Sequence, residues 1–208
     1  MFEEEFLKTL SQLSSDVALP LQLWKELKSY YCRADRYYHN LTHLDHLHQE
    51  LLPVKDLVDD WQVLVLSVAY HDSIYNTIKQ DNEEKSAKYA LEKITKLNLS
   101  ESRIQSCKEQ ILATKGHQHS KFNDTNYFTD ADLSILGMPE NVYEDYINAV
   151  RKEYAFYPDF LYKPGRQKVL KHFLGMNSVY KTDHFKNKYE MKARQNMEAE
   201  LRSFSGRV

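Results

Sequence analysis

One apolar run, WQVLVLSVAY at residues 61–70, most constrains the fold of this chain. Its composition would also suit a strand, because periodicity cannot sort short apolar runs. No second segment of similar character is present to pair with it, and the neighbouring segments have helical spacing. The run is also about half as long as a membrane span needs to be. We therefore expect a buried helix, over residues 61–75, in an all-α protein.

The rest of the chain contains many helix-forming residues and few helix breakers. Gly and Pro number 5 each in 208 residues, and charged residues make up 28%. Such a composition, with abundant Leu, Lys, Glu and Gln, favours helices. No linker divides the sequence, so it predicts a single domain over residues 1–208, a bundle of about eight helices with short connections. The other predicted helices span 20–34, 40–52, 81–97, 100–114, 139–156, 165–174 and 184–203.

Net charge and cysteine content narrow the functional classes. The formal net charge is −2 and the pI is near 6.5, so we expect no binding to a nucleic-acid polymer through bulk positive charge. Cys32 and Cys107 suggest neither a disulfide framework nor a metal-binding spacing, which favours a reduced, cytoplasmic location. The acidic start, MFEEEFLKTL, is unlike a signal peptide, and we expect no membrane association.

Three histidines cluster in the segment YYHNLTHLDH. On a helix, His39, His43 and His46 would share one face. Imidazole is the commonest metal-binding side chain, and histidines four residues apart on a helix can bind one ion. A solvated polar face explains the same spacing, so the cluster alone leaves both interpretations open. His48 points away from this face, and we expect it at the surface.

A His-Asp pair ends the apolar run. His71 and Asp72 follow a helix that should cross the core, so their side chains should be at least partly buried. A buried ionised carboxylate needs a partner, and a metal ion is one of the few partners that also suits an adjacent histidine. A buried His-Asp hydrogen bond without a metal is the alternative.

Two aspartates lie among apolar residues in the segment YFTDADLSILG. The sequence predicts a helix start here, and Thr129 with Asp130 could supply its N-terminal cap. Asp132 is then left as a candidate for another role. Oxygen and nitrogen ligands without thiolate suit Mg²⁺, Mn²⁺, Fe²⁺, Co²⁺, Ni²⁺ or Zn²⁺.

The order of these residues resembles the H…HD…D signature of the HD-domain superfamily of metal-dependent phosphohydrolases. YHNLTH is similar to the YHN-x-x-H segment of cyclic-nucleotide phosphodiesterases, and ILAT and ADLS resemble further phosphodiesterase segments. The chain also resembles a group of short bacterial proteins described only as predicted HD-superfamily phosphohydrolases. That resemblance covers nearly the whole chain, through RYYHNLTHL, YHDSIYN, DNEEKSA, DADLSILG, RKEY and GRQKVL.

The resemblance implies a fold, a metal site and a general acid. The fold would be an HD-domain helical bundle. The protein ligands of one divalent ion would be His43, His71, Asp72 and Asp132. His39 matches the histidine that protonates the leaving group. Many two-metal members have a further histidine where this chain has Tyr75, so a second ion would be weakly held, with Asp72 as its bridge.

An acidic residue and a loop histidine are further candidates near such a site. Glu83 in DNEEKSA resembles an acidic residue that helps to activate water in some HD nucleotidases. A favourable interaction with the helix dipole explains Glu83 equally well. His117, more than His119, could reach the site from the loop after ILAT, although both suit an ordinary loop.

Three basic residues are candidates for binding phosphate. Guanidinium groups bind phosphate oxygens with two hydrogen bonds, which suggests Arg151 and Arg166, and Lys115 is a third candidate. Salt bridges to neighbouring helices are the alternative for all three.

The expected function is metal-assisted hydrolysis of a nucleotide or another small phosphorylated metabolite, as phosphomonoesterase or phosphodiesterase. The alternatives are a non-catalytic nucleotide-binding sensor, a di-iron HD-type oxygenase and a purely structural metal site. Tyrosines in KEYAFYPDFLY suit either a pocket lid or a homodimer contact, so the oligomeric state stays open.

Overall fold

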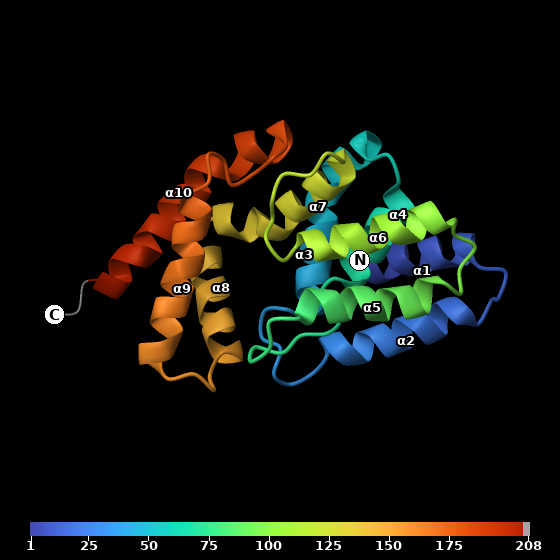
Figure 1. Cartoon of the computed structure of the whole chain (residues 1–208), viewed down its shortest axis with the longest axis horizontal. Coiled ribbons are helices and arrows are strands. Elements are labelled where there is room, and N and C mark those ends of the chain that lie inside the picture. The colour runs from blue at the N-terminus through green and yellow to red at the C-terminus, as the bar shows by residue number, and fades with distance from the viewer. Residues whose placement is uncertain (206–208) are drawn as a thin grey trace. The chain divides into compact units, whose positions relative to one another are not determined.

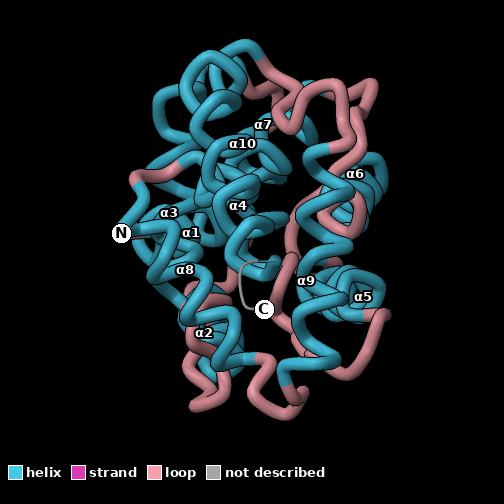
Figure 2. The backbone as a smooth tube through the Cα atoms, turned by 90° about the vertical axis from the view of Figure 1, so that its left-hand side faces the viewer, coloured by secondary structure: helices cyan, strands magenta, loops and turns pink. Residues whose placement is uncertain are grey.

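The protein is all-α, as the sequence predicts. A computed structural model describes residues 1–205, and all regular secondary structure among them is helical (Figures 1 and 2). In chain order the elements are α1 (Phe2–Leu13), α2 (Leu19–Tyr31), α3 (Leu41–Leu51), η1 (Leu52–Leu57), α4 (Trp61–Tyr70), α5 (Asn82–Ile94), α6 (Glu101–Ala113), α7 (Asn123–Asp132), η2 (Leu133–Gly137), α8 (Glu140–Glu153), α9 (Asp159–Leu174) and α10 (Asp183–Ser205).

Contacts divide the chain into two compact units, Met1–Thr129 and the residues from Asp130 onward. The first unit holds α1 to α6 and most of α7, and the second holds the end of α7, then η2 and α8 to α10. Within the described residues, no helix has both the length and the apolar character that crossing a membrane requires.

Helix α4 is the centre of the first unit. Every residue from Val63 to Tyr70 is buried, and the helix packs against α1, α3, α5 and α6. A helix that is apolar on all sides must be covered on all sides. The prediction of a buried helix is confirmed, although the helix ends at Tyr70 and His71 and Asp72 form the turn that follows it.

Polar side chains fix the start of α4. The Asp60 carboxylate accepts a hydrogen bond from the backbone N–H of Val63, as an N-cap residue should. Arg103 from α6 pairs with Asp60 through two hydrogen bonds of 2.6 and 2.8 Å. The Asp124 carboxylate accepts from the backbone N–H groups of Asp59 and Asp60. These hydrogen bonds hold the N-terminal end of α4 in place.

Helix α3 begins two residues after His39. Asn40 caps it by accepting a hydrogen bond from the backbone N–H of Thr42. His39 therefore lies in the preceding loop and not on the helical face that the spacing predicted. His48 lies inside the first unit, beside the rings of Phe2 and Trp61, so its predicted surface position was wrong.

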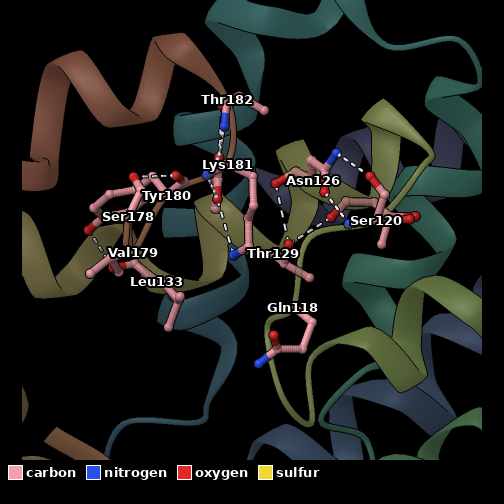
Figure 3. Close-up of polar contacts among 12 residues, drawn as sticks. Gln118, Ser120, Asn126, Thr129, Leu133, Ser178, Val179, Tyr180, Lys181 and Thr182 are labelled. Carbon is pink, nitrogen blue, oxygen red and sulfur yellow. Dashed lines mark hydrogen bonds and ion pairs between the residues drawn. The ribbon is translucent and has the colours of Figure 1, made fainter. Parts of the chain in front are cut away.

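The predicted helix start at Thr129 was also wrong, because α7 begins at Asn123 and ends at Asp132. The segment NDTN has loop-like composition but is held by buried hydrogen bonds. The Asn126 side chain accepts from the Ser120 N–H and donates to the Ser120 carbonyl, and the Thr129 hydroxyl donates to the Thr125 carbonyl (Figure 3).

The second unit is assembled around α10, which packs against η2 and α9. Asn196 of α10 donates to the carbonyls of Leu136 and Met138. Gly137 lies so close to Tyr189 that a Cβ added there would be 2.6 Å from the Tyr189 Cβ. A glycine is thus required for this approach of η2 to α10.

Candidate metal centre

Three elements bring nitrogen and oxygen donors together. His43 comes from the first turn of α3, His71 from the end of α4 and Asp132 from the last turn of α7, a helix that begins in the first unit. One potential ligand atom from each of these residues lies within 4.8 Å of the other two, and both histidines are buried. This group could hold a metal ion. His39, His46 and Asp72 are not in the group.

The backbone determines which nitrogen His71 presents. Its Nδ1 lies 2.9 Å from the Val68 carbonyl oxygen in the preceding turn of α4. A carbonyl oxygen can only accept, so Nδ1 carries the proton and donates it. In the neutral ring, Nε2 then has its lone pair directed away from this bond. Metal-binding histidines are typically oriented in this way by a hydrogen bond at the other ring nitrogen.

The Nε2 atoms of the two buried histidines face each other. Nε2 of His43 lies 3.3 Å from Nε2 of His71. The Asp72 Oδ2 lies 3.1 Å from Nε2 of His71 and 3.9 Å from Nε2 of His43. Ring nitrogens beside a partly exposed carboxylate form an electron-rich cluster, and the donor set fits a divalent cation that accepts nitrogen and oxygen ligands.

Two hydroxyl side chains hold the turn that carries His71 and Asp72. The Tyr31 hydroxyl donates to the Ala69 carbonyl at 3.0 Å, and the Ser73 hydroxyl donates to the Tyr70 carbonyl at 2.8 Å. These bonds satisfy carbonyls that the end of a helix leaves without intrahelical partners. The two site residues are thus attached to a rigid helix end.

His39 approaches the same carboxylate from the loop before α3. Its Nε2 lies 3.9 Å from Oδ2 of Asp72, and its side chain is partly exposed. The His39 ring centroid is 4.3 Å from that of Tyr75, with the planes at 31°, and 4.9 Å from that of Tyr38, which meets it edge-on. The two tyrosines therefore limit the orientations that the imidazole can adopt.

Glu83 lies in the first turn of α5, which is tied to the loop after Asp72. Asn82 donates to the Asn76 carbonyl and accepts from the Asn76 N–H, and Ser86 exchanges hydrogen bonds with the backbone of Ile74. Burial raises the pKa of Glu83, and the negative charge of Asp72 adds to the increase. This carboxyl group holds its proton more tightly than an ordinary glutamate.

Lys115 and the loop histidines lie beyond the end of α6. The Lys115 ammonium pairs with Glu84 at 2.5 Å and donates to the Gln80 carbonyl, and all of these groups are exposed. His117 has a positive φ of 50°, and its N–H donates to the Ala113 carbonyl, so it terminates α6 in the left-handed conformation. His119 is exposed.

The two predicted phosphate-binding arginines lie in ion pairs of the second unit. Arg166 is buried and pairs with Glu200 through hydrogen bonds of 2.8 and 3.0 Å. Arg151 donates to Asp159 and to the carbonyls of Tyr154 and Tyr157. Both arginines thus form salt bridges, which was the alternative to phosphate binding that the sequence left open.

Sequence reasoning gave Arg36 no role, yet it contacts both site-bearing segments. Its buried guanidinium donates to the carbonyls of His39, Asp72 and Ser73. The only sequence signal is an arginine three residues before His39 in RYYHN, and a basic residue in a polar loop ordinarily suggests a solvated side chain.

Comparisons with known proteins add no further constraint, because no family model, curated protein or solved structure matches the chain.

Proposed function

We propose that the protein is a metal-dependent phosphohydrolase that acts on a nucleotide or another small phosphorylated metabolite. The observation that carries this proposal is the buried pair of Nε2 atoms, from His43 and His71, with a carboxylate oxygen of Asp132 within 4.8 Å. The resemblance to HD-domain phosphohydrolases supports the choice of reaction, and the locked tautomer of His71 supports a bound ion.

The proposed ligands are His43, His71, Asp72 and Asp132. Neutral imidazole and carboxylate suit Mn²⁺, Mg²⁺, Fe²⁺, Co²⁺, Ni²⁺ or Zn²⁺, and Asp72 would bridge to a weakly held second ion. When bound, a divalent cation lowers the pKa of a coordinated water and polarises a phosphoryl oxygen.

His39 is the proposed general acid. In its protonated form it would donate a proton to the leaving oxygen of the phosphoester. Its partial exposure leaves the ring accessible to a substrate. The Tyr75 ring beside it holds the imidazole plane in one orientation.

Glu83 and four candidate substrate contacts complete the proposal. Glu83, whose pKa is raised, would exchange a proton with the attacking water. Lys115 and His117 are the proposed substrate contacts in the first unit. Arg151 and Arg166 would have to leave the ion pairs described above before they could bind a phosphate.

The test combines metal analysis with a screen for phosphate release. Purified protein is stripped with a chelator, reloaded with each of the six metals and assayed on nucleoside monophosphates, cyclic nucleotides and sugar phosphates. We expect one divalent ion per chain at high affinity and phosphate release from at least one substrate. Asp72→Ala should lose both properties, and His172→Ala, which removes an exposed histidine on α9, should lose neither.

The alternatives give different results in the same experiment. A nucleotide-binding sensor would show a ligand-induced thermal shift without phosphate release. A di-iron oxygenase would retain two irons per chain. Turnover at the wild-type rate in Asp72→Ala would refute the proposal.

A further inference from the structure

Arg36 lies in the loop between α2 and α3 and is 6% exposed. Its Nη1 donates to the carbonyl of His39 at 3.0 Å and to that of Asp72 at 2.7 Å, and its Nη2 donates to the carbonyl of Ser73 at 2.9 Å. The guanidinium thus places a buried positive charge among neutral carbonyls, and none of these three hydrogen bonds goes to a carboxylate. Such an arrangement is costly and calls for an explanation.

The three carbonyls belong to two separate segments of the chain. One precedes α3 and carries His39, and the other follows α4 and carries His71, Asp72 and Ser73. A single guanidinium therefore sets the separation of the two backbones. The 3.9 Å approach of the His39 ring to the Asp72 carboxylate depends on that separation.

The surroundings of Arg36 suit a guanidinium and no other side chain. Its central carbon lies 4.9 Å from the Tyr31 ring centroid and 5.4 Å from that of Tyr75, distances that permit cation–π attraction. The positive charge also lies at the carboxyl end of α4, where the helix dipole favours a cation. A lysine has one nitrogen and cannot reproduce the planar fork that reaches three oxygens.

We propose that Arg36 is a positioning residue that fixes the His39 loop against the His71-Asp72 turn, and so sets metal affinity and the alignment of His39. The proposal rests on the proposed function for its catalytic part only. Its structural part, a fixed spacing of metal ligands, holds for any reaction at this site.

The experiment compares Arg36→Lys and Arg36→Gln with the matched control Arg194→Lys. Arg194 also donates to backbone carbonyls, those of Leu174 and Met176, but it lies in the second unit and pairs with Glu190. The metal dissociation constant is measured by titration with Mn²⁺ or Co²⁺ in the absence of substrate. Hydrogen exchange of residues 37–43 and 71–76 is measured on the metal-free proteins, and kcat and KM are measured on the best substrate.

We expect both Arg36 variants to bind the metal about 10- to 100-fold more weakly than wild type, as residues that support metal ligands typically do. Exchange in the two segments should accelerate, and kcat should fall with little change in KM, because a displaced general acid acts only in the transition state. Arg194→Lys should lower the unfolding temperature and change none of these quantities.

Two results would overturn the proposal. One is wild-type metal affinity and segment protection in a folded Arg36 variant, and Arg36→Gln serves if Arg36→Lys does not fold. The other is an equal loss of affinity in Arg194→Lys, which would indicate general destabilisation. A wild-type protein that binds metal but releases no phosphate would refute the proposed function, while the affinity and exchange measurements would still decide the role of Arg36.

Discussion

Two buried polar clusters of this protein differ in how their hydrogen-bonding groups are matched. In the second unit, the Glu200 carboxylate accepts two hydrogen bonds from Arg166 and one of 2.6 Å from the Tyr143 hydroxyl. The Tyr146 hydroxyl accepts from Arg166 in turn. Burial raises the pKa of Tyr143, and the adjacent Glu200 charge raises it further, so the phenol stays a donor. Charges and donors balance within this cluster.

The cluster of the first unit is centred on two histidine ring nitrogens and a carboxylate. Nδ1 of His71 donates to the Val68 carbonyl, so its Nε2 is directed at Nε2 of His43 and at the Asp72 carboxylate. Burial is similar in the two clusters, so burial does not distinguish them. The comparison shows a difference in chemistry: the cluster of the second unit contains its own cation, Arg166, whereas the cluster of the first unit presents nitrogen and oxygen groups of the kind that bind a divalent cation.

The largest expected effect is on the stability of the Arg166–Glu200 cluster in the second unit. Glu200→Ala leaves the Arg166 charge buried without its partner, which should lower the free energy of unfolding by about 3–5 kcal/mol. Urea unfolding gives the value. Glu198→Ala removes an exposed pair on the same helix and should change little. Equal losses in the two variants would show that the buried pair contributes nothing specific.

The next effect is metal-dependent stabilisation through the His43–His71 cluster of the first unit. A divalent metal at 100 times its dissociation constant should stabilise the wild type by about 2.7 kcal/mol, because it binds only the folded state. His43→Ala should lose this gain, since it removes a ligand, whereas Glu200→Ala should retain it. Thermal unfolding with and without metal measures both. If metal stabilised His43→Ala as much as the wild type, the stabilisation would have to come from binding at another site.

A smaller effect is expected from a third buried polar group, His48. Neither of its ring nitrogens has a hydrogen-bond partner among the described residues, and burial lowers its pKa below the value of about 6.5 that an exposed histidine has. As the pH falls below 6.5, the unfolded chain takes up a proton before the folded protein does, so stability is lost. His48→Leu should be less sensitive to acid than wild type in urea midpoints at pH 7.5 and 5.5. An unchanged pH dependence would assign the acid sensitivity elsewhere, and His172→Ala is the control.

The smallest effect on stability is expected at Lys115. Its pair with Glu84 is exposed, as is the pair of Lys85 with Asp81, so neither Lys115→Ala nor Lys85→Ala should change the unfolding temperature measurably. KM is the sharper measurement. Loss of a charged contact to phosphate should raise KM about tenfold in Lys115→Ala alone. A parallel change in both variants would reflect only the reduced surface charge.

The sequence predicts those parts of the fold that depend on local composition. Residues 61–70 are apolar on every side, and such a helix must be central wherever its neighbours lie. The leucines of α3 form a stripe that likewise determines its buried face. The pairing of His43 with His71 is a long-range property, and it was expected from the resemblance to a family and not from spacing alone.

The errors arise where tertiary contacts override local preference. NDTN has the composition of a loop, because Asn, Asp and Thr compete for backbone hydrogen bonds, yet here those same bonds build the first turns of α7. His48 has no sequence signal for burial, since Phe2 of α1 and Trp61 of α4 cover it through tertiary contacts. Arg36 was missed because its partners are backbone carbonyls, which are present at every residue.

The C-terminal end of α7 carries two aspartates, Asp130 and Asp132, that have different contacts. Asp130 accepts hydrogen bonds from the Lys181 and Thr182 N–H groups just before α10 (Figure 3 shows Lys181 and Thr182), and Asp132 belongs to the group that could hold a metal ion. An ion bound to Asp132 would therefore act on the same turn that anchors the start of α10. The amide resonances of residues 181 and 182 would then serve as remote reporters of metal loading, without any probe at the ligands themselves.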